Sequence, residues 1–309
     1  MEFRVVDIFS GGGGLGLGFK NSGYKVVAAF DNWQPALDFY IANFNGHPIV
    51  NCDLSEPSAI DLIARYKPNM IIGGPPCQDF SSAGKRDETL GRADLTVDYA
   101  LIVSKIKPTW FVMENVERAQ SSNSVKKALK IFKDANYGIT KIVLDASKCG
   151  VPQKRKRFFV IGELNGNDDA LLNIMLNRQR ENLMTMRDYF GNRLNIEYYY
   201  RHPRSYKRRG IFRIDEPSPT IRGVNRPVPE GYPGHPGDPV PMNENIRPLT
   251  TLERFEVQTF PSNIKLVGSK TDLEQIVGNA VPVKLAQYVA EGINQYLENK
   301  INGFRPNLF

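Results

Sequence analysis

The sequence predicts an α/β fold, in which a doubly wound, mostly parallel sheet of the Rossmann-like type is joined to a second, smaller domain. Three observations indicate this fold. Short runs of branched and aromatic residues alternate with helix-like segments as far as about residue 162. A glycine-rich turn follows the first of these runs. After about residue 166 the alternation ends, and arginine, tyrosine, proline and glycine dominate.

The alternating segments define the expected strands and helices. The strand candidates are FRVVDIF, KVVAAF, MIIGG, WFVMENV, GITKIVL and RFFVIG, which are short and apolar enough to be covered on both faces. Between them, apolar residues show helical spacing at 34–44, 57–66, 96–105 and 124–136, with Pro35 and Pro57 in first turns. Another amphipathic helix is expected after Pro282.

The change in composition predicts the domain boundaries. We expect a larger domain at 1–165, completed by 265–309, and a small domain at 166–264. Between Arg178 and Arg226 there are eleven arginines and one lysine against five acidic residues. A disordered or merely solvated insert is the alternative interpretation, but the segment keeps aromatic and β-branched residues and has no low-complexity repeat.

Overall composition limits the class of protein. The chain has 309 residues, 41% of them apolar, and a net charge of +7, which favours a polyanionic partner. Its three cysteines, Cys52, Cys77 and Cys149, are too few and too scattered for a disulfide framework or a CxxC metal site. The N-terminus is charged, and no apolar stretch is long enough to span a bilayer. We therefore expect a cytoplasmic monomer with no metal and no membrane partner.

The glycine-rich turn and two acidic residues indicate an adenosine site. Gly11, Gly13 and Gly16 form a G-x-G-x-x-G pattern, and such a turn lets the backbone approach a ligand at the edge of an open sheet. Asp31 follows the second strand and is suited to ribose hydroxyls, whereas Asp53 could accept from an adenine amino group. A structural glycine loop is the alternative. The pattern alone fits either NAD or S-adenosylmethionine.

Two further strand ends suggest the chemistry. The fourth strand runs into GGPPCQDFSS, where two prolines stiffen the loop that presents Cys77 beside the predicted crevice. A lone cysteine is more often buried and inert than nucleophilic. The fifth strand ends in Glu114-Asn115-Val116, and Glu114 could be only a helix cap or an ion-pair partner. Because both residues fall at neighbouring strand ends, an active site explains them better.

These motifs resemble the DNA (cytosine-5)-methyltransferase family, and specifically its bacterial restriction-modification enzymes. The resemblance is carried, in the family's order and over essentially the whole chain, by the FSGGGG turn, GGPPCQDFSSAGK, ENV at 114–116, QKRKR at 153–157, RPLTTLERFEVQTFP at 247–261 and GNAVP at 278–282. It implies the cofactor S-adenosylmethionine, duplex DNA as the partner, and methyl transfer to carbon 5 of a flipped cytosine through an adduct between Cys77 and carbon 6. It also implies that the basic insert recognises the target, and that the protein protects DNA from a cognate restriction enzyme and is nucleoid-associated when bound to DNA.

The resemblance assigns roles to individual residues. The catalytic residues are Cys77, Glu114, Arg155 and Arg157. The cofactor residues are Phe9, Gly11, Gly13, Gly14, Leu15, Asp31, Asn32, Asp53, Leu54, Pro75, Leu95, Asn279 and Val281. The DNA-contacting residues are Gln78, Ser81, Lys85, Arg92, Arg209, Thr220, Arg222 and Arg226.

Two positions depart from the family pattern. An aromatic residue usually follows the ribose-binding acid and stacks on adenine, but this chain has Asn32 there and Trp33 one place later. The loop after the cysteine reads Arg92-Ala93-Asp94-Leu95, where glycine commonly follows the arginine, so Arg92 and Leu95 alone carry over.

Other functions stay open from the sequence. A tRNA cytosine-5 methyltransferase shares the cysteine loop and ENV but typically carries a Cys-Phe-Thr element that this chain lacks. An inactive DNA-binding homologue would tend to lose Cys77 or Glu114, and a nicotinamide dehydrogenase leaves PCQ and ENV unexplained. No residue stands out as the base for the carbon 5 proton. The arginine-rich insert favours a G/C-containing recognition site without defining it.

Overall fold

A seven-stranded sheet forms the centre of the larger domain. The computed structural model describes residues 3–76, 94–205 and 207–303. The strand order is β3-β2-β1-β4-β5-β8-β6. The strands are β1 (Arg4–Ile8), β2 (Lys25–Asp31), β3 (Ile49–Asn51), β4 (Met70–Gly73), β5 (Trp110–Val116), β6 (Tyr137–Asp145) and β8 (Lys156–Leu164).

The sheet is parallel except at β8. Strands β1 to β5 pair in parallel, whereas β8 lies antiparallel between β5 and β6. This confirms the predicted doubly wound, mostly parallel α/β fold. Because β1 to β5 run the same way, the segments that follow them meet at one edge of the sheet, where open α/β sheets bind ligands.

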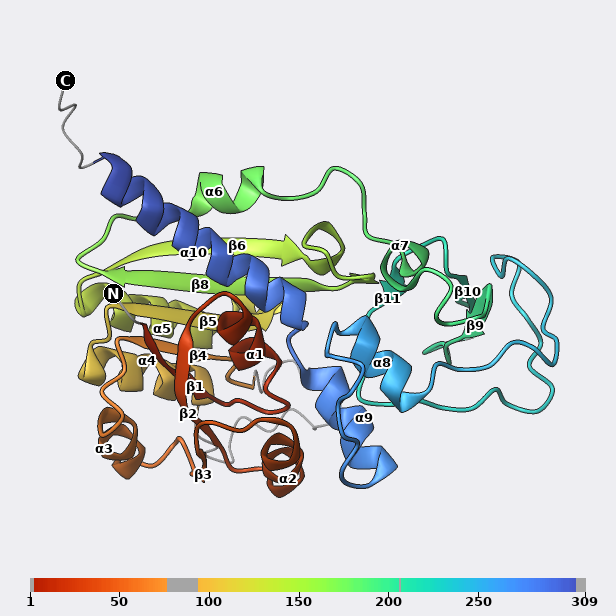
Figure 1. Ribbon diagram of the computed structural model, residues 1–309, viewed down its shortest axis with the longest axis horizontal. Helices are drawn as coiled ribbons and strands as arrows, with labels where there is room; N and C mark the ends of the chain where they lie inside the picture. The colour runs from red at the N-terminus through yellow and green to blue at the C-terminus, as the bar shows by residue number, and fades with distance from the viewer. Residues whose placement is uncertain (1–2, 77–93, 206, 304–309) are drawn as a thin grey trace.

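Helices cover both faces of the sheet. One face packs against α1 (Gly14–Asn21), α6 (Leu172–Asn177) and α10 (Val283–Gly303), and the other against α3 (Ser58–Ala64), α4 (Leu95–Ile106) and α5 (Asn123–Asp134). Side chains alternate between the faces, so Val5 belongs to the first core and Val6 to the second. Figure 1 shows α10 crossing the first face beside α1.

The smaller domain lies beside the end of the sheet where β6 ends and β8 begins (Figure 1). It contains α7 (Met186–Phe190) and a hairpin of β9 (Tyr198–Tyr200) and β10 (Ile211–Arg213). It is joined to the sheet through β11 (Ser218–Pro219), which pairs in parallel with β7 (Gln153–Lys154). Its core continues onto α2 (Gln34–Asn43), α8 (Thr251–Val257) and α9 (Lys270–Asn279).

Helix α6 belongs with the larger domain. Leu171 and Met175 are buried in the core between the sheet and α10, although the predicted boundary at residue 166 assigns them to the small domain. The packing therefore favours a boundary after α6, with residues 1–177 and 265–309 forming the larger body; the division stays a proposal. Within the described ranges, no helix combines the length and the apolar character needed to cross a membrane.

Candidate active site

A pocket of about 570 Å³ opens at the edge of the sheet where the parallel strands end. It is built from the segments that follow β1, β2, β3 and β4, the end of β5, and the connection from α9 to α10. Its size is typical of a site for a small organic cofactor. Of the thirteen predicted cofactor residues, twelve line it: Phe9, Gly11, Gly14, Leu15, Asp31, Asn32, Asp53, Leu54, Pro75, Leu95, Asn279 and Val281.

The glycine turn exposes its backbone to this pocket. Gly11 has a φ of +50°, and a Cβ atom there would meet nothing within 4 Å, so its peptide faces open space. Gly13, the remaining predicted cofactor residue, is absent from the lining. It has a φ of +74° just before α1, and a Cβ there would come within 3 Å of the Phe44 and Tyr40 rings. Glycine at 13 therefore serves the turn and its packing.

Asp31 holds the turn in place. Its Oδ2 accepts a hydrogen bond from the Gly11 amide at 2.7 Å, and its Oδ1 accepts from the amides of Asn32 at 2.9 Å and Trp33 at 3.0 Å. Three bonds leave lone pairs on the carboxylate for a ligand. These backbone amides therefore fix the Asp31 carboxylate at the pocket wall, where it can accept hydrogen bonds from a ligand.

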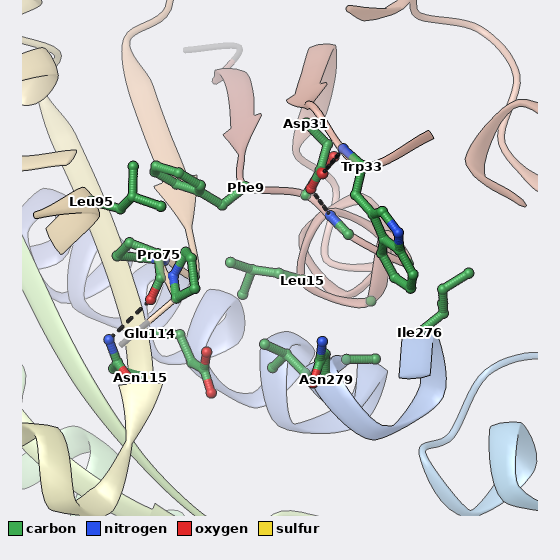
Figure 2. A pocket seen from close by; sticks show the side chains of 18 of the residues that line it. Phe9, Leu15, Asp31, Trp33, Pro75, Leu95, Glu114, Asn115, Ile276 and Asn279 are labelled. Atoms are coloured by element: carbon green, nitrogen blue, oxygen red, sulfur yellow. Dashed lines mark hydrogen bonds between the residues drawn. The ribbon is translucent and has the colours of Figure 1, made fainter. Parts of the chain in front are cut away.

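Apolar side chains line two sides of the pocket. Phe9, Pro75 and Leu95 gather on one side in Figure 2, while Trp33 and Ile276 lie on the opposite side. Trp33 thus lines the pocket although the aromatic residue stands one place later than the family pattern. Asp53 is exposed at the rim and accepts hydrogen bonds from the Ser55 amide and hydroxyl at 3.0 and 2.7 Å, which lower the pKa of its carboxyl.

Glu114 is the buried carboxyl of the pocket. It is 7% exposed, and its Oε1 lies 2.8 Å from Arg157 Nε. Burial raises the pKa of Glu114, while the charges of Arg157 and Arg155 offset part of this rise. A Cβ at Gly74 would lie 3.0 Å from Glu114 Oε2, so this glycine leaves the second oxygen accessible. Glu114 is therefore expected to keep its proton to a higher pH than an exposed glutamate does.

Asn115 connects the end of β5 to the loop after β4. Its Nδ2 donates to the Pro75 carbonyl at 3.1 Å, as the dashed line in Figure 2 shows, and its Oδ1 accepts from the Val116 amide at 2.8 Å. Pro75 and Pro76 lead directly to Cys77. Asn115 therefore holds the described start of the cysteine loop beside Glu114.

Several predicted residues fall outside the described part of the chain: Cys77, Gln78, Ser81, Lys85 and Arg92. The other two cysteines are buried, and neither is suited to nucleophilic attack. Burial raises the pKa of Cys52, and burial raises that of Cys149 to about 12. A thiol with a raised pKa carries little thiolate at neutral pH.

The two arginines of the QKRKR motif have different surroundings. Arg157 lines the pocket beside Glu114. Arg155 is 1% exposed and does not line it; instead its guanidinium donates to the carbonyls of Ile221, Gly278 and Ala280. The structure thus gives Arg155 a contact with the pocket wall, and base contact by Arg155 stays a prediction.

The predicted DNA-contacting residues of the small domain also differ in the contacts that they make within the protein. Thr220 donates to the Lys154 carbonyl at 2.7 Å, and Lys154 directly precedes Arg155 in the chain. Arg209 forms an ion pair with Glu216 at 2.5 Å, and its guanidinium lies over the Phe212 ring. Arg222 donates to the His202 carbonyl. The ion pairs between described residues do not involve Arg226.

Some residues of the site were not assigned from the sequence. The sequence shows Trp33 only as an aromatic residue one place from the family position, and Asn115 only as part of the ENV motif. Gln153 and Gln258 form a buried amide pair with an Nε2 to Oε1 distance of 2.7 Å. Both belong to quoted motifs, QKRKR and EVQTFP, but their pairing joins residues 105 positions apart and has no local signal.

Comparison with known proteins agrees with this geometry. Residues 3–295 match the family described as C-5 cytosine-specific DNA methylase. The Type II methyltransferase M.HindV of Haemophilus influenzae is 54% identical over 300 residues, covering 96% of this chain and 98% of the relative. M.HgiDI of Herpetosiphon aurantiacus is 53% identical over 295 residues, covering 95% of both chains.

Solved structures with low sequence identity share the fold. A Dnmt2 methyltransferase of S. pombe superposes with a TM-score of 0.70 at 16% identity, covering 98% of this chain and 100% of the other. A putative DNA modification methyltransferase from an E. coli prophage gives a TM-score of 0.69 at 22% identity, covering 96% and 100%. Sequence match, fold and pocket together show that the chain belongs to the C-5 cytosine-specific DNA methylase family and is a DNA cytosine-5-methyltransferase.

Proposed function

We propose that the protein transfers a methyl group from S-adenosylmethionine to carbon 5 of a cytosine flipped out of a specific duplex sequence, through a covalent bond between Cys77 and carbon 6. The observation that supports this best is Glu114, a buried carboxyl paired with Arg157 in the pocket that the glycine turn lines. Two curated relatives are Type II methyltransferases, so we also propose that the modification protects DNA from a cognate restriction enzyme.

The pocket fits an adenosine cofactor. The bare backbone of Gly11 can approach a ligand closely, and Asp31 keeps lone pairs for ribose hydroxyls. Phe9, Leu54 and Leu95 supply apolar surface for a base, and the exposed Asp53 can accept from an amino group. When bound, S-adenosylmethionine supplies an electrophilic methyl group; the chain's own residues hold and orient it.

Activation of cytosine explains the catalytic residues. Carbon 5 of cytosine is too weak a nucleophile to be methylated directly. We propose that the Cys77 thiolate forms a bond to carbon 6 while Glu114, whose raised pKa favours the protonated form, donates a hydrogen bond or its proton to ring N3. The electron pair of the former double bond then makes carbon 5 nucleophilic enough to take the methyl group. The bond between the methyl carbon and the sulfonium sulfur breaks in this transfer, and a proton given to N3 returns to Glu114. Loss of the carbon 5 proton, for which water is the proposed base, then restores the double bond between carbons 5 and 6 and expels Cys77 as the thiolate.

The depth of Glu114 supports the proposal that the target base is flipped. Its carboxyl is almost fully buried, so a cytosine stacked inside a duplex cannot reach it. Extruding the base costs a few kcal/mol, which contacts to the flipped nucleotide must offset. Arg157 lies at the pocket wall beside Glu114 and is placed to contact the flipped base, while it also fixes the orientation of the carboxyl.

Four cationic side chains of the small domain are candidates for reading DNA. This arginine cluster consists of Arg201, Arg204, Arg222 and Arg226. Burial and then Arg222 lower the pKa of Arg201 to about 10, and burial followed by Arg204 and Arg226 lowers that of Arg222. Such mutual repulsion is relieved by an anion, and DNA offers phosphates and the acceptor edge of guanine. Arg209, in contrast, already pairs with Glu216.

Replacing Arg204 or Arg226 by alanine is expected to weaken DNA binding. A phosphate contact should reduce the salt slope of binding by about one on every sequence, whereas a base contact should cost about 1–3 kcal/mol and relax one position of the site. Affinity measured against salt concentration on matched and mutated duplexes distinguishes the two. Arg187→Ala is the control, because Arg187 pairs with Glu197 and Asp215 and is not among the predicted DNA-contacting residues, and it should leave the salt slope unchanged. Wild-type slope and site preference in both cluster variants would place recognition elsewhere.

The proposed function is tested by methylating a plasmid of mixed sequence. Purified protein with S-adenosylmethionine should produce 5-methylcytosine at one recurring sequence, which bisulfite sequencing identifies. Labelled cofactor with tRNA in place of DNA should give little transfer. Preferential labelling of tRNA would mean that tRNA, and not DNA, is the substrate. Cofactor binding without methylation of either nucleic acid would favour the inactive-homologue interpretation.

A further inference from the structure

A buried polar junction connects the small domain to the wall of the cofactor pocket. It joins the recognition segment, defined as residues 220–223, to the pocket loop, defined as residues 277–281. Three side chains form the junction, Gln153, Arg155 and Gln258, and all are at most 1% exposed. Gly278, Asn279, Ala280 and Val281 of the pocket loop line the proposed cofactor site.

Arg155 provides one link between the two segments. Its Nη1 donates to the Ile221 carbonyl at 3.0 Å, and its Nη2 donates to the carbonyls of Gly278 at 2.8 Å and Ala280 at 3.0 Å. The planar guanidinium holds these three acceptors in a fixed relation, which an ammonium group on a flexible chain cannot do.

The two glutamines provide a second link. Gln153 Oε1 accepts from the Ile221 amide at 2.9 Å, and Gln153 Nε2 donates to Gln258 Oε1 at 2.7 Å. Gln258 Nε2 then donates to the carbonyls of Val277 at 2.7 Å and Ala280 at 3.2 Å. Both links therefore begin at the peptide groups of Ile221 and end on Ala280.

The backbones of the two segments also touch directly. A Cβ at Gly278 would lie 2.2 Å from the Gly223 amide nitrogen, so no larger residue fits. Close packing and two hydrogen-bonded links leave little freedom for one segment to move without the other. Burying the Arg155 charge costs desolvation free energy, and apolar side chains could stabilise the fold equally well. We therefore infer that the junction is kept because it fixes the relative position of the two segments.

We propose that Arg155 and the Gln153–Gln258 pair couple the two binding events, so that target DNA on the recognition segment strengthens cofactor binding at the pocket loop. This rests on the proposed function, since it takes DNA and S-adenosylmethionine as the two ligands. Arg155 is then a positioning residue. By linkage the effect is reciprocal, and the cofactor strengthens DNA binding by the same factor.

The test measures the affinity of S-adenosylhomocysteine by calorimetry with and without a duplex that contains the mapped methylation site. The wild-type protein should show tighter binding with the duplex, by a factor of about 5 to 150. Arg155→Lys should bring this factor close to one, while the affinity without DNA changes less. Arg178→Lys is the matched control, because Arg178 also donates to a carbonyl, that of Tyr288, but lies outside the junction. It should keep the wild-type factor.

A second variant and a reciprocal measurement keep the proposal testable. If Arg155→Lys does not fold, Gln258→Met, which keeps the side-chain length and removes the amide, should reduce the same factor. Duplex affinity with and without S-adenosylhomocysteine should give an equal factor for each protein. Wild-type coupling in a folded junction variant, or no coupling in a wild-type protein that methylates DNA normally, would overturn the inference. A wild-type protein that does not methylate DNA would instead contradict the proposed function.

Discussion

Replacement of Cys77 by serine is expected to abolish methyl transfer. A serine hydroxyl has almost no anion at neutral pH, so it cannot add to carbon 6 of cytosine as a thiolate does. Turnover is measured with labelled S-adenosylmethionine and a duplex that carries the mapped site, and cofactor affinity is measured beside it. Cofactor binding should be retained, because the described pocket lining is unchanged by the substitution.

A duplex with 5-fluorocytosine at the target position tests the covalent step itself. After the methyl group is added, carbon 5 must lose a cation, and fluorine cannot leave as one, so the adduct through Cys77 should persist during denaturing electrophoresis. It should require S-adenosylmethionine and be absent in Cys77→Ser. Cys149→Ala, which removes a buried thiol that does not line the pocket, should still form the adduct. More than a tenth of wild-type turnover in Cys77→Ser would contradict covalent catalysis by this residue.

Glu114→Gln is expected to lower turnover by about two to four orders of magnitude, the range for a positioned acid-base group. Glutamine keeps the shape of the side chain but has no proton to give to cytosine N3. Turnover under saturating cofactor and DNA measures the effect. Glu117→Gln is the matched control, since Glu117 follows the same strand but is only partly buried and pairs with Lys156, and it should stay close to wild type. A loss of turnover below tenfold in Glu114→Gln would indicate that Glu114 has only a structural role.

The pH dependence gives an independent check on Glu114. Burial raises the pKa of its carboxyl, so the protonated form persists above the usual range and is lost as pH rises through the raised value. The ratio kcat/KM should therefore decline with increasing pH once the Glu114 proton is lost, after an initial rise as Cys77 becomes a thiolate. Glu114→Gln should lose the declining limb and keep the rising one. A declining limb that is unchanged in the variant would assign it to another group.

The class of fold and most of the proposed cofactor pocket follow from the amino-acid sequence. Both depend on local patterns: apolar strands alternate with helices, each of Phe9, Asp31, Asp53 and Pro75 stands at or just after the end of a strand, and Glu114 lies in the last three residues of β5. In a parallel sheet such positions meet at one edge, so their neighbourhood follows from their place along the chain. The pocket there is lined by all five residues.

For residues without a local pattern, long-range packing decides which contacts they make. The insertion of β8 between β5 and β6 is a choice among pairings that the strand sequences permit equally. The arginines illustrate the same point: Arg209 pairs with Glu216, whereas Arg155 binds carbonyls that lie 66 to 125 residues away. A long cationic side chain has no periodicity that reveals its partner. Whether it contacts solvent, a carboxylate or a backbone is fixed by which distant segments the fold places within its reach.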